Sequence, residues 1–216
     1  MTEQNFEQMR RAMVASQLRT TGVDDPRVLA AMGAVPRERF VPADRAVIAY
    51  ADAVLPLAAG RGLNSPMALG KLLTEAAPRA EDNALVVGAA TGYAAAVLAR
   101  LVASVVAVEE EPALAAMAKG LLAGDKVKLV AGPLAKGHKP GAPYDLILID
   151  GAVEQIPQAL IDQLADGGRL AAGLIERGVQ RLALGQRAGD GFGMVAFADA
   201  ASAVLPGFAK PQGFSF

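Results

Sequence analysis

A glycine-rich turn and a downstream glutamate are the residues whose types and spacing best fit a ligand site. The stretch "ALVVGAATGYAAAVLAR" (84–100) runs from a short apolar strand through Gly88, Ala90 and Gly92 into a predicted helix. Glycines there let the backbone approach a ligand, and the N–H groups that open a helix favour electronegative atoms. Glu109 ends the next predicted strand, where its carboxylate can accept hydrogen bonds from both hydroxyls of a ribose. Together these features indicate a cofactor that carries a nucleoside.

The same residues also fit a structural role. Gly88 and Gly92 can simply make a tight strand-to-helix turn, with Glu109 in solvent. Among cofactors, NAD fits less well, because its site favours G-x-G-x-x-G and position 90 is Ala. The sulfonium and amino-acid end of S-adenosylmethionine need a spacious turn rather than a pyrophosphate cradle. The sequence therefore favours S-adenosylmethionine.

A parallel sheet is needed to bring these residues to one edge. From residue 84 onward, short apolar segments alternate with helical ones. Strands that are apolar on both faces are typical of a parallel sheet covered on both sides. The predicted strands are 84–88, 104–110, 127–132, 144–150 and 167–175, and the predicted helices between them are 92–102, 112–123 and 156–165.

The two ends of the chain have other patterns. Apolar residues between Phe6 and Leu18 fall near one helical face, and helices are also predicted at 24–35 and 66–77. The segments "VQRLALGQR" and "FGMVAFAD" predict an antiparallel hairpin, and 204–216 is expected to close an apolar groove. We therefore expect an α/β fold of the Rossmann-like methyltransferase type. It would have a mostly parallel open sheet with helices on both faces, a C-terminal antiparallel hairpin and an N-terminal helical extension.

Composition excludes several classes of function. The 216 residues suit one domain and include no cysteine and a single histidine, His138, which excludes thiol nucleophiles and Cys-ligated zinc. We expect no metal site. A net charge of −1 without a basic block argues against nucleic acid as a partner. The N-terminus is not a signal peptide and no apolar run is long enough to span a membrane, so a cytoplasmic location without membrane binding is expected.

Longer stretches of sequence carry a more specific resemblance. They are "MVASQLRTTGVDDPRVLAAMGAVPRERFVP" (13–42), "LPLAAGRGLNSP" (55–66), "GYAAAVLARL" (92–101) and "APYDLILIDGAVEQIPQALIDQLADGGRL" (142–170). In these stretches the chain resembles protein-L-isoaspartate O-methyltransferases, from about residue 8 to the hairpin near residue 197. The N-terminal block is the specific part, because glycine turns are shared by many methyltransferases.

The resemblance implies a repair enzyme. Its cofactor would be S-adenosylmethionine, and its partner an isoaspartyl-containing protein or peptide. The enzyme would methylate the free α-carboxylate of L-isoaspartyl or D-aspartyl residues in damaged protein. It also implies an N-terminal helical extension with a substrate loop (1–66) and a methyltransferase domain (67–216), packed as a single compact unit. The sequence does not indicate an oligomeric state.

The resemblance also assigns residues to the site. It places Gly88, Ala90, Gly92 and Glu109 at the cofactor, and Asn64 and Ser65 on the substrate loop near the acceptor carboxylate. From its place at the end of the most apolar strand, Asp150 is expected in the cofactor crevice, where it would face the substrate or the cofactor's ammonium group, with a capping role as the alternative. For Asn64 and Ser65, the alternative is that they only shape the loop before a proline.

Several positions depart from what such enzymes commonly carry. Gly62 and Asn64 stand where a Thr and a Ser are common, and Val86 stands where an acid meets the cofactor's ammonium group. Ala90 replaces a glycine, and Pro133 replaces an Asp that accepts from the adenine amino group. Together these changes predict cofactor binding weakened more than about a hundredfold, or several kcal/mol. Two alternatives therefore stay open: a non-catalytic binding module of the same fold, and a methyltransferase with another acceptor.

Overall fold

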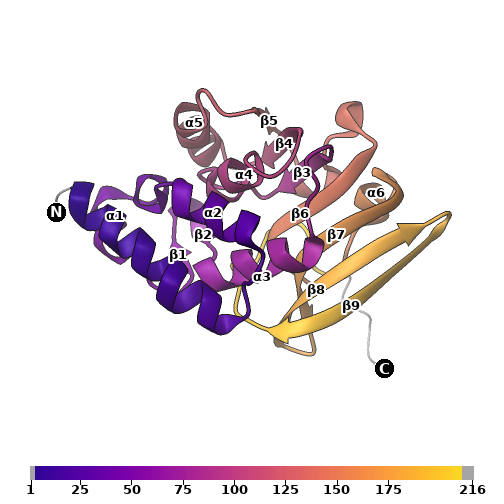
Figure 1. Ribbon diagram of the computed structural model, residues 1–216. Helices are drawn as coiled ribbons and strands as arrows, with labels where there is room; N and C mark the ends of the chain where they lie inside the picture. Colours follow the sequence, from indigo (N-terminus) through magenta and orange to yellow (C-terminus); the bar gives the residue numbers. More distant parts are fainter. Residues whose placement is uncertain (1–2, 211–216) are drawn as a thin grey trace.

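A seven-stranded sheet forms the centre of the molecule (Figure 1). The computed structural model describes residues 3–210. The strand order is β5-β4-β3-β6-β7-β8-β9, with the first five strands parallel and the last two antiparallel. This arrangement confirms the predicted mostly parallel sheet and its C-terminal hairpin. The strands of the sheet are β3 (Asn83–Val87), β4 (Ser104–Glu109), β5 (Val127–Ala131), β6 (Tyr144–Val153), β7 (Leu164–Glu176), β8 (Val179–Ala188) and β9 (Gly191–Asp199).

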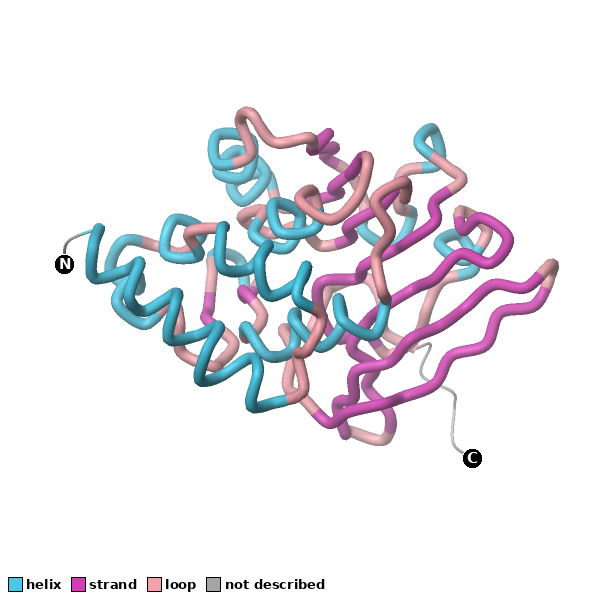
Figure 2. Tube along the Cα trace, viewed as in Figure 1, coloured by secondary structure: helices cyan, strands magenta, loops and turns pink. Residues whose placement is uncertain are grey.

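Most helices gather on one side of the sheet (Figure 2). Side chains alternate along each strand, so Val86 and Leu148 face these helices and join one apolar cluster with Leu69 and Ala95. A separate two-stranded sheet, β1 (Leu55–Pro56) with β2 (Gly62–Leu63), lies within residues 55–66, the stretch that the resemblance predicts to be the substrate loop. The helices are α1 (Glu3–Ala12), α2 (Pro26–Ala34), α3 (Pro66–Ala76), α4 (Tyr93–Leu98), α5 (Pro112–Leu121) and α6 (Gln158–Ile161).

The N-terminal amphipathic helix is confirmed, with one irregularity. Helix α1 continues as a π-helical segment over Met13–Leu18, and both end residues of that segment are buried in the core. The next helix, α2, begins as its sequence predicts, because Pro26 occupies the first turn and the Asp25 carboxylate accepts from the Arg27 N–H. The extension thus packs into the same apolar cluster as the sheet.

The opposite face of the sheet has much less helix than the sequence predicts. The helix predicted over 156–165 is only α6, Gln158–Ile161, because β7 already begins at Leu164. Residues 200–210, which we call the C-terminal strap, cover this face instead. Leu205 and Phe208 of the strap are buried there in one cluster with α6. The prediction that the C-terminal segment closes a groove is confirmed for this part, whereas 211–216 lie outside the described residues.

The strap is held along β6 by backbone pairing. The Ala152 N–H donates to the Ala203 carbonyl at 2.7 Å, and the Leu205 N–H donates to the Ala152 carbonyl at 3.0 Å. Val204 forms a parallel bridge with Ala152. The strap therefore lies directly beside the last part of β6, which contains Asp150 and Gly151.

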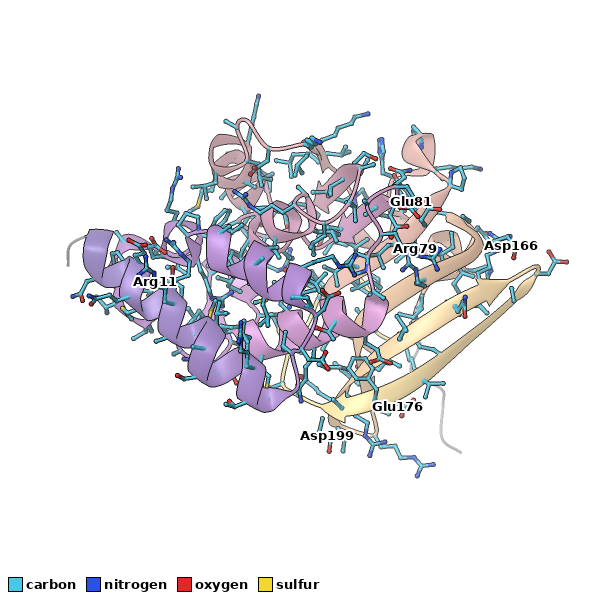
Figure 3. The ribbon with its side chains drawn as sticks, in the orientation of Figure 1. Arg11, Arg79, Glu81, Asp166, Glu176 and Asp199 are labelled. Carbon is cyan, nitrogen blue, oxygen red and sulfur yellow. The ribbon has the colours of Figure 1, made fainter. Side chains whose placement is uncertain are left out.

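Ordinary charged side chains lie on the outside of the fold. Those labelled in Figure 3 are all exposed: Arg11, Arg79, Glu81, Asp166, Glu176 and Asp199. Of the helices within residues 3–210, none is both long enough and apolar enough to cross a bilayer. Against this background, charged groups buried at the carboxyl ends of the strands need an explanation.

Candidate functional site

The glycine-rich turn adopts a left-handed backbone at three positions. φ is 80° at Gly88, 50° at Ala90 and 101° at Gly92. A non-glycine residue in this region costs about 1–2 kcal/mol, so Ala90 carries the strain expected if its position required positive φ. A Cβ at Gly92 would lie 2.9 Å from Leu122 Cδ1, so close packing also requires glycine there. The turn therefore requires a backbone conformation that residues other than glycine rarely adopt.

Glu109 is buried and hydrogen-bonded, not solvated. Its Oε2 accepts from the Ala90 N–H at 2.6 Å, which ties the end of β4 to the glycine-rich turn. Its Oε1 accepts from the N–H groups of Glu110 and Glu111 at 3.0 and 2.9 Å. The sequence thus placed Glu109 correctly beside the turn, but its oxygens already have partners within the protein.

The fourth partner of Glu109 is Arg61, a residue that the sequence did not single out. Arg61 Nη1 donates to Glu109 Oε1 at 2.5 Å, and the two side chains are 4% and 0% exposed. Its guanidinium also lies over the turn, with Nη2 3.1 Å from the position of a Cβ on Gly88. Arg61 Nε has no hydrogen-bond partner within residues 3–210. The Glu109 carboxylate, which is proposed to bind the ribose, is therefore already paired with a buried arginine.

Asn64 joins the substrate loop to two other parts of the site. Its Nδ2 donates to Asp150 Oδ1 at 2.6 Å, and its Oδ1 accepts from the Ala203 N–H at 2.7 Å. Its carbonyl accepts from Arg37 Nη2 at 2.5 Å. Asn64 thus connects the loop, β6 and the strap, with one hydrogen bond at each end of its amide group.

Asp150 lies at the carboxyl end of the central strands, as predicted. Burial raises the pKa of its carboxyl to about 6, although the hydrogen bond from Asn64 and the charges of Arg37 and Arg61 favour the ionised form. The nearby charge of Glu109 adds to the increase. These four side chains with Asp150 form one electrostatic cluster in which protonation matters near neutral pH.

Ser65 has the capping role that its position before Pro66 allows. It is the N-cap of α3, and its hydroxyl oxygen accepts from the Ala68 N–H at 3.2 Å. The hydroxyl hydrogen remains able to donate. The structure thus places Ser65 beside Asn64 in the buried loop, and its catalytic role stays a prediction.

Leu205 of the strap lies over the same crevice as Arg61. A Cβ on Gly88 would be 2.9 Å from Leu205 Cδ1, and a Cβ on Gly151 would be 2.5 Å from Leu205 Cγ. The space beyond the ends of β3 and β6 is therefore filled by an arginine and a leucine of the chain itself.

We expect Gly151→Ala to loosen the strap. The added methyl group would also meet the Ala203 carbonyl oxygen at 2.6 Å, and a backbone atom cannot turn away as a side chain can. Overpacking of this kind typically lowers the free energy of unfolding by about 1–3 kcal/mol. Hydrogen exchange at the Ala152 and Leu205 amides, with Gly120→Ala in open space as the control, measures the effect. Unchanged protection of both amides would contradict this prediction.

The structure shows what surrounds two of the positions that differ from the residues common in the family. Val86 is fully buried and faces the helices, so an ammonium group cannot find its partner there. Pro133 opens the turn after β5, and the Glu110 carboxylate accepts from the Leu134 N–H next to it at 3.3 Å. Glu110 therefore brings a carboxylate to the place where an Asp was expected.

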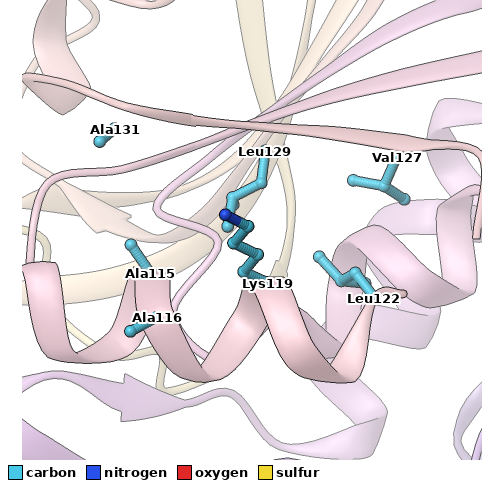
Figure 4. A pocket seen from close by; sticks show the side chains of 7 residues that line it. All are labelled: Ala115, Ala116, Lys119, Leu122, Val127, Leu129 and Ala131. Carbon is cyan, nitrogen blue, oxygen red and sulfur yellow. The ribbon is translucent and has the colours of Figure 1, made fainter.

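A separate hollow lies between α5 and β5 (Figure 4). It measures about 420 Å³ and contains none of the predicted site residues. Within the described residues, no cluster of three or more His, Cys, Asp or Glu side chains is arranged to hold a metal ion. The chemically distinctive groups are those at the ends of the strands.

The sequence as a whole matches a known family. The model of the family described as protein-L-isoaspartate(D-aspartate) O-methyltransferase matches residues 9–202, from the N-terminal extension to the start of the strap. The chain belongs to this family. The resemblance predicted from the N-terminal block and the strand motifs is confirmed.

Individual members of the isoaspartyl methyltransferase family agree with this assignment. A protein-L-isoaspartate O-methyltransferase of Methanoculleus marisnigri is 42% identical over 176 residues, which cover 80% of each chain. One from Methylorubrum populi is 44% identical over 74% of this chain and 77% of its own.

Solved structures show the same fold. A protein-L-isoaspartate O-methyltransferase has a TM-score of 0.80 at 23% identity, over 92% of this chain and 66% of its own. A putative one from Plasmodium falciparum, in complex with S-adenosyl-L-homocysteine, has a TM-score of 0.77 at 18% identity over 93% and 97%. The methyltransferase fold class is thus confirmed along nearly the whole chain.

Proposed function

We propose that this protein transfers a methyl group from S-adenosylmethionine to the free α-carboxylate of L-isoaspartyl or D-aspartyl residues in damaged proteins. Its partner is an isoaspartyl-containing protein or peptide, and the methyl ester begins repair. Family membership supports the reaction. The observation that carries the site is Glu109, a buried carboxylate at the end of β4 bonded to the Ala90 N–H of the glycine-rich turn.

The chemistry needs few special groups from the protein. S-adenosylmethionine, when bound, supplies an electrophilic methyl group on a sulfonium. A carboxylic acid with a pKa of about 4 is already ionised at neutral pH, so no general base is required. The residues of the chain hold the acceptor oxygen in line and exclude water, which the buried loop around Asn64 and Ser65 is suited to do.

The crevice fits the cofactor only after Arg61 and Leu205 have moved. Glu109 would accept from the ribose hydroxyls, Gly88 and Gly92 would give the backbone room, and Asp150 would face the ammonium group in place of Val86. Glu110, beside Pro133, would accept from the adenine amino group. In this conformation, however, Arg61 forms an ion pair with the Glu109 carboxylate. The ribose therefore fits only when Arg61 moves away.

Calorimetric titration of S-adenosylhomocysteine into the purified protein tests this proposal first. We expect binding in the micromolar range, followed by methyl ester formation on an isoaspartyl peptide and none on the same peptide with normal Asp. No heat up to millimolar ligand would contradict the proposal. It would favour a binding module without catalysis, a reading that Arg61 and Leu205 over Gly88 also support.

A further inference from the structure

Arg61 differs from the other buried arginine of the crevice in what holds it. Arg37 donates to two backbone carbonyls, those of Ala49 and Asn64, and stacks on the Tyr93 ring at 4.7 Å. It is fixed by the fold. Among the described hydrogen bonds, the Glu109 carboxylate is the only partner of the Arg61 side chain. One nitrogen of each arginine, Nε of Arg61 and Nη1 of Arg37, has no partner within residues 3–210. Arg61 therefore depends on a carboxylate to balance its buried charge.

Other groups of the substrate loop cannot take that role. Gly62 has no side chain, and both ends of the Asn64 amide are already used by Asp150 and the Ala203 N–H. Ser65 can donate one hydrogen bond but carries no charge. A carboxylate that enters this buried loop needs a cation, and an arginine is the side chain that pairs best with it.

We propose that Arg61 exchanges partners during the reaction: it releases Glu109 to the cofactor's ribose and then binds the acceptor carboxylate. This inference rests on the proposed function and extends it to the substrate. Both partners are carboxylates, and Arg61 belongs to the same loop as Asn64 while its guanidinium reaches Glu109 and the Gly88 turn. Cofactor binding thus frees Arg61 for the acceptor carboxylate. The cofactor therefore binds first and the isoaspartyl substrate second.

The exchange also agrees with the charges of the reaction. In methyl transfer the C–S bond breaks and a C–O bond forms, so a sulfonium and a carboxylate become a neutral thioether and a neutral ester, and no proton moves. Arg61 pairs with one carboxylate oxygen and leaves the other free to attack. Once the ester forms, Arg61 has lost its anion and returns to Glu109, which favours release of both products.

Arg61→Gln and Arg61→Met test the exchange. Without Arg61 the ribose no longer competes for Glu109, so S-adenosylhomocysteine binds at least about tenfold tighter by calorimetry. The isoaspartyl peptide loses its cation, so its KM rises at least about tenfold while kcat changes less than about threefold. Glu109 keeps three backbone N–H donors in these variants, which favours folding. Thermal unfolding of each variant checks this.

Opposite changes in the two affinities are the signature of the exchange. The matched control is Arg181→Gln, which breaks an exposed ion pair with Asp199 and leaves both constants unchanged. Equal or weaker S-adenosylhomocysteine binding in the Arg61 variants would overturn the exchange, and so would an unchanged peptide KM. A wild-type protein that neither binds S-adenosylhomocysteine nor methylates the peptide would overturn the proposed function itself, and the exchange with it.

Discussion

Glu109→Ala is expected to abolish S-adenosylhomocysteine binding and to destabilise the fold. The substitution removes the acceptor proposed for the ribose, and it leaves the Arg61 guanidinium buried without a counter-charge. Breaking a buried ion pair from one side typically costs about 3–5 kcal/mol of unfolding free energy. The Ala90 N–H also loses its acceptor, at a position already strained by positive φ. Chemical denaturation and calorimetric titration measure the two effects.

A double variant separates the two effects. Glu109→Ala with Arg61→Met removes both buried charges, so much of the lost stability returns, because neither partner is left unpaired. Binding of S-adenosylhomocysteine does not return, because the carboxylate is still absent. If Glu109→Ala alone bound the ligand as the wild type does, Glu109 would have only the structural role of tying β4 to the turn.

The sequence predicts the fold well where periodicity reports on burial. The five parallel strands, α2, α3 and the hairpin follow from apolar patterns and from proline and acidic residues at helix starts. The prediction fails over 156–165, where the composition suits a helix but α6 stops at Ile161. There the chain must enter β7, and the strap covers the face that a longer helix would have covered. Tertiary packing therefore sets the length of α6, and the local sequence does not reveal it.

At the site, the sequence identifies residues but not their partners. Glu109 and Asp150 are recognisable because each carboxylate follows an apolar run. Glu109 ends β4 as that pattern predicts, whereas β6 continues past Asp150 to Val153. Arg61 pairs with Glu109 across 48 positions and Asn64 with Asp150 across 86, and nothing in the loop "AAGRGLNSP" indicates either contact. Such pairs depend on the path of the substrate loop over the sheet, which is set by the whole fold.

Asp150→Asn is expected to stabilise the protein above pH 6. Burial raises the pKa of Asp150 in the folded state to about 6, above its ordinary value of 3.8, so between these values the folded state binds more protons than the unfolded state. Stability therefore falls as pH rises from about 4 to about 6. Near pH 7 this difference between the two pKa values lowers the free energy of unfolding by about 3 kcal/mol. Asparagine keeps the oxygen that accepts from Asn64 but has no charge to bury.

The difference between variant and wild type should thus grow from near zero at pH 4 to its full value above pH 6. Denaturation across this range measures it, with Asp44→Asn on the exposed surface as the control. A variant that becomes less stable than the wild type as pH rises above about 4 would show instead that attraction by Arg37 and Arg61 outweighs burial. If Asp150→Asn gains stability and loses S-adenosylhomocysteine affinity, the charge destabilises the fold but is needed for the cofactor's ammonium group. That result would explain how the site can bind the ammonium group although Val86, in the neighbouring strand β3, carries no charge.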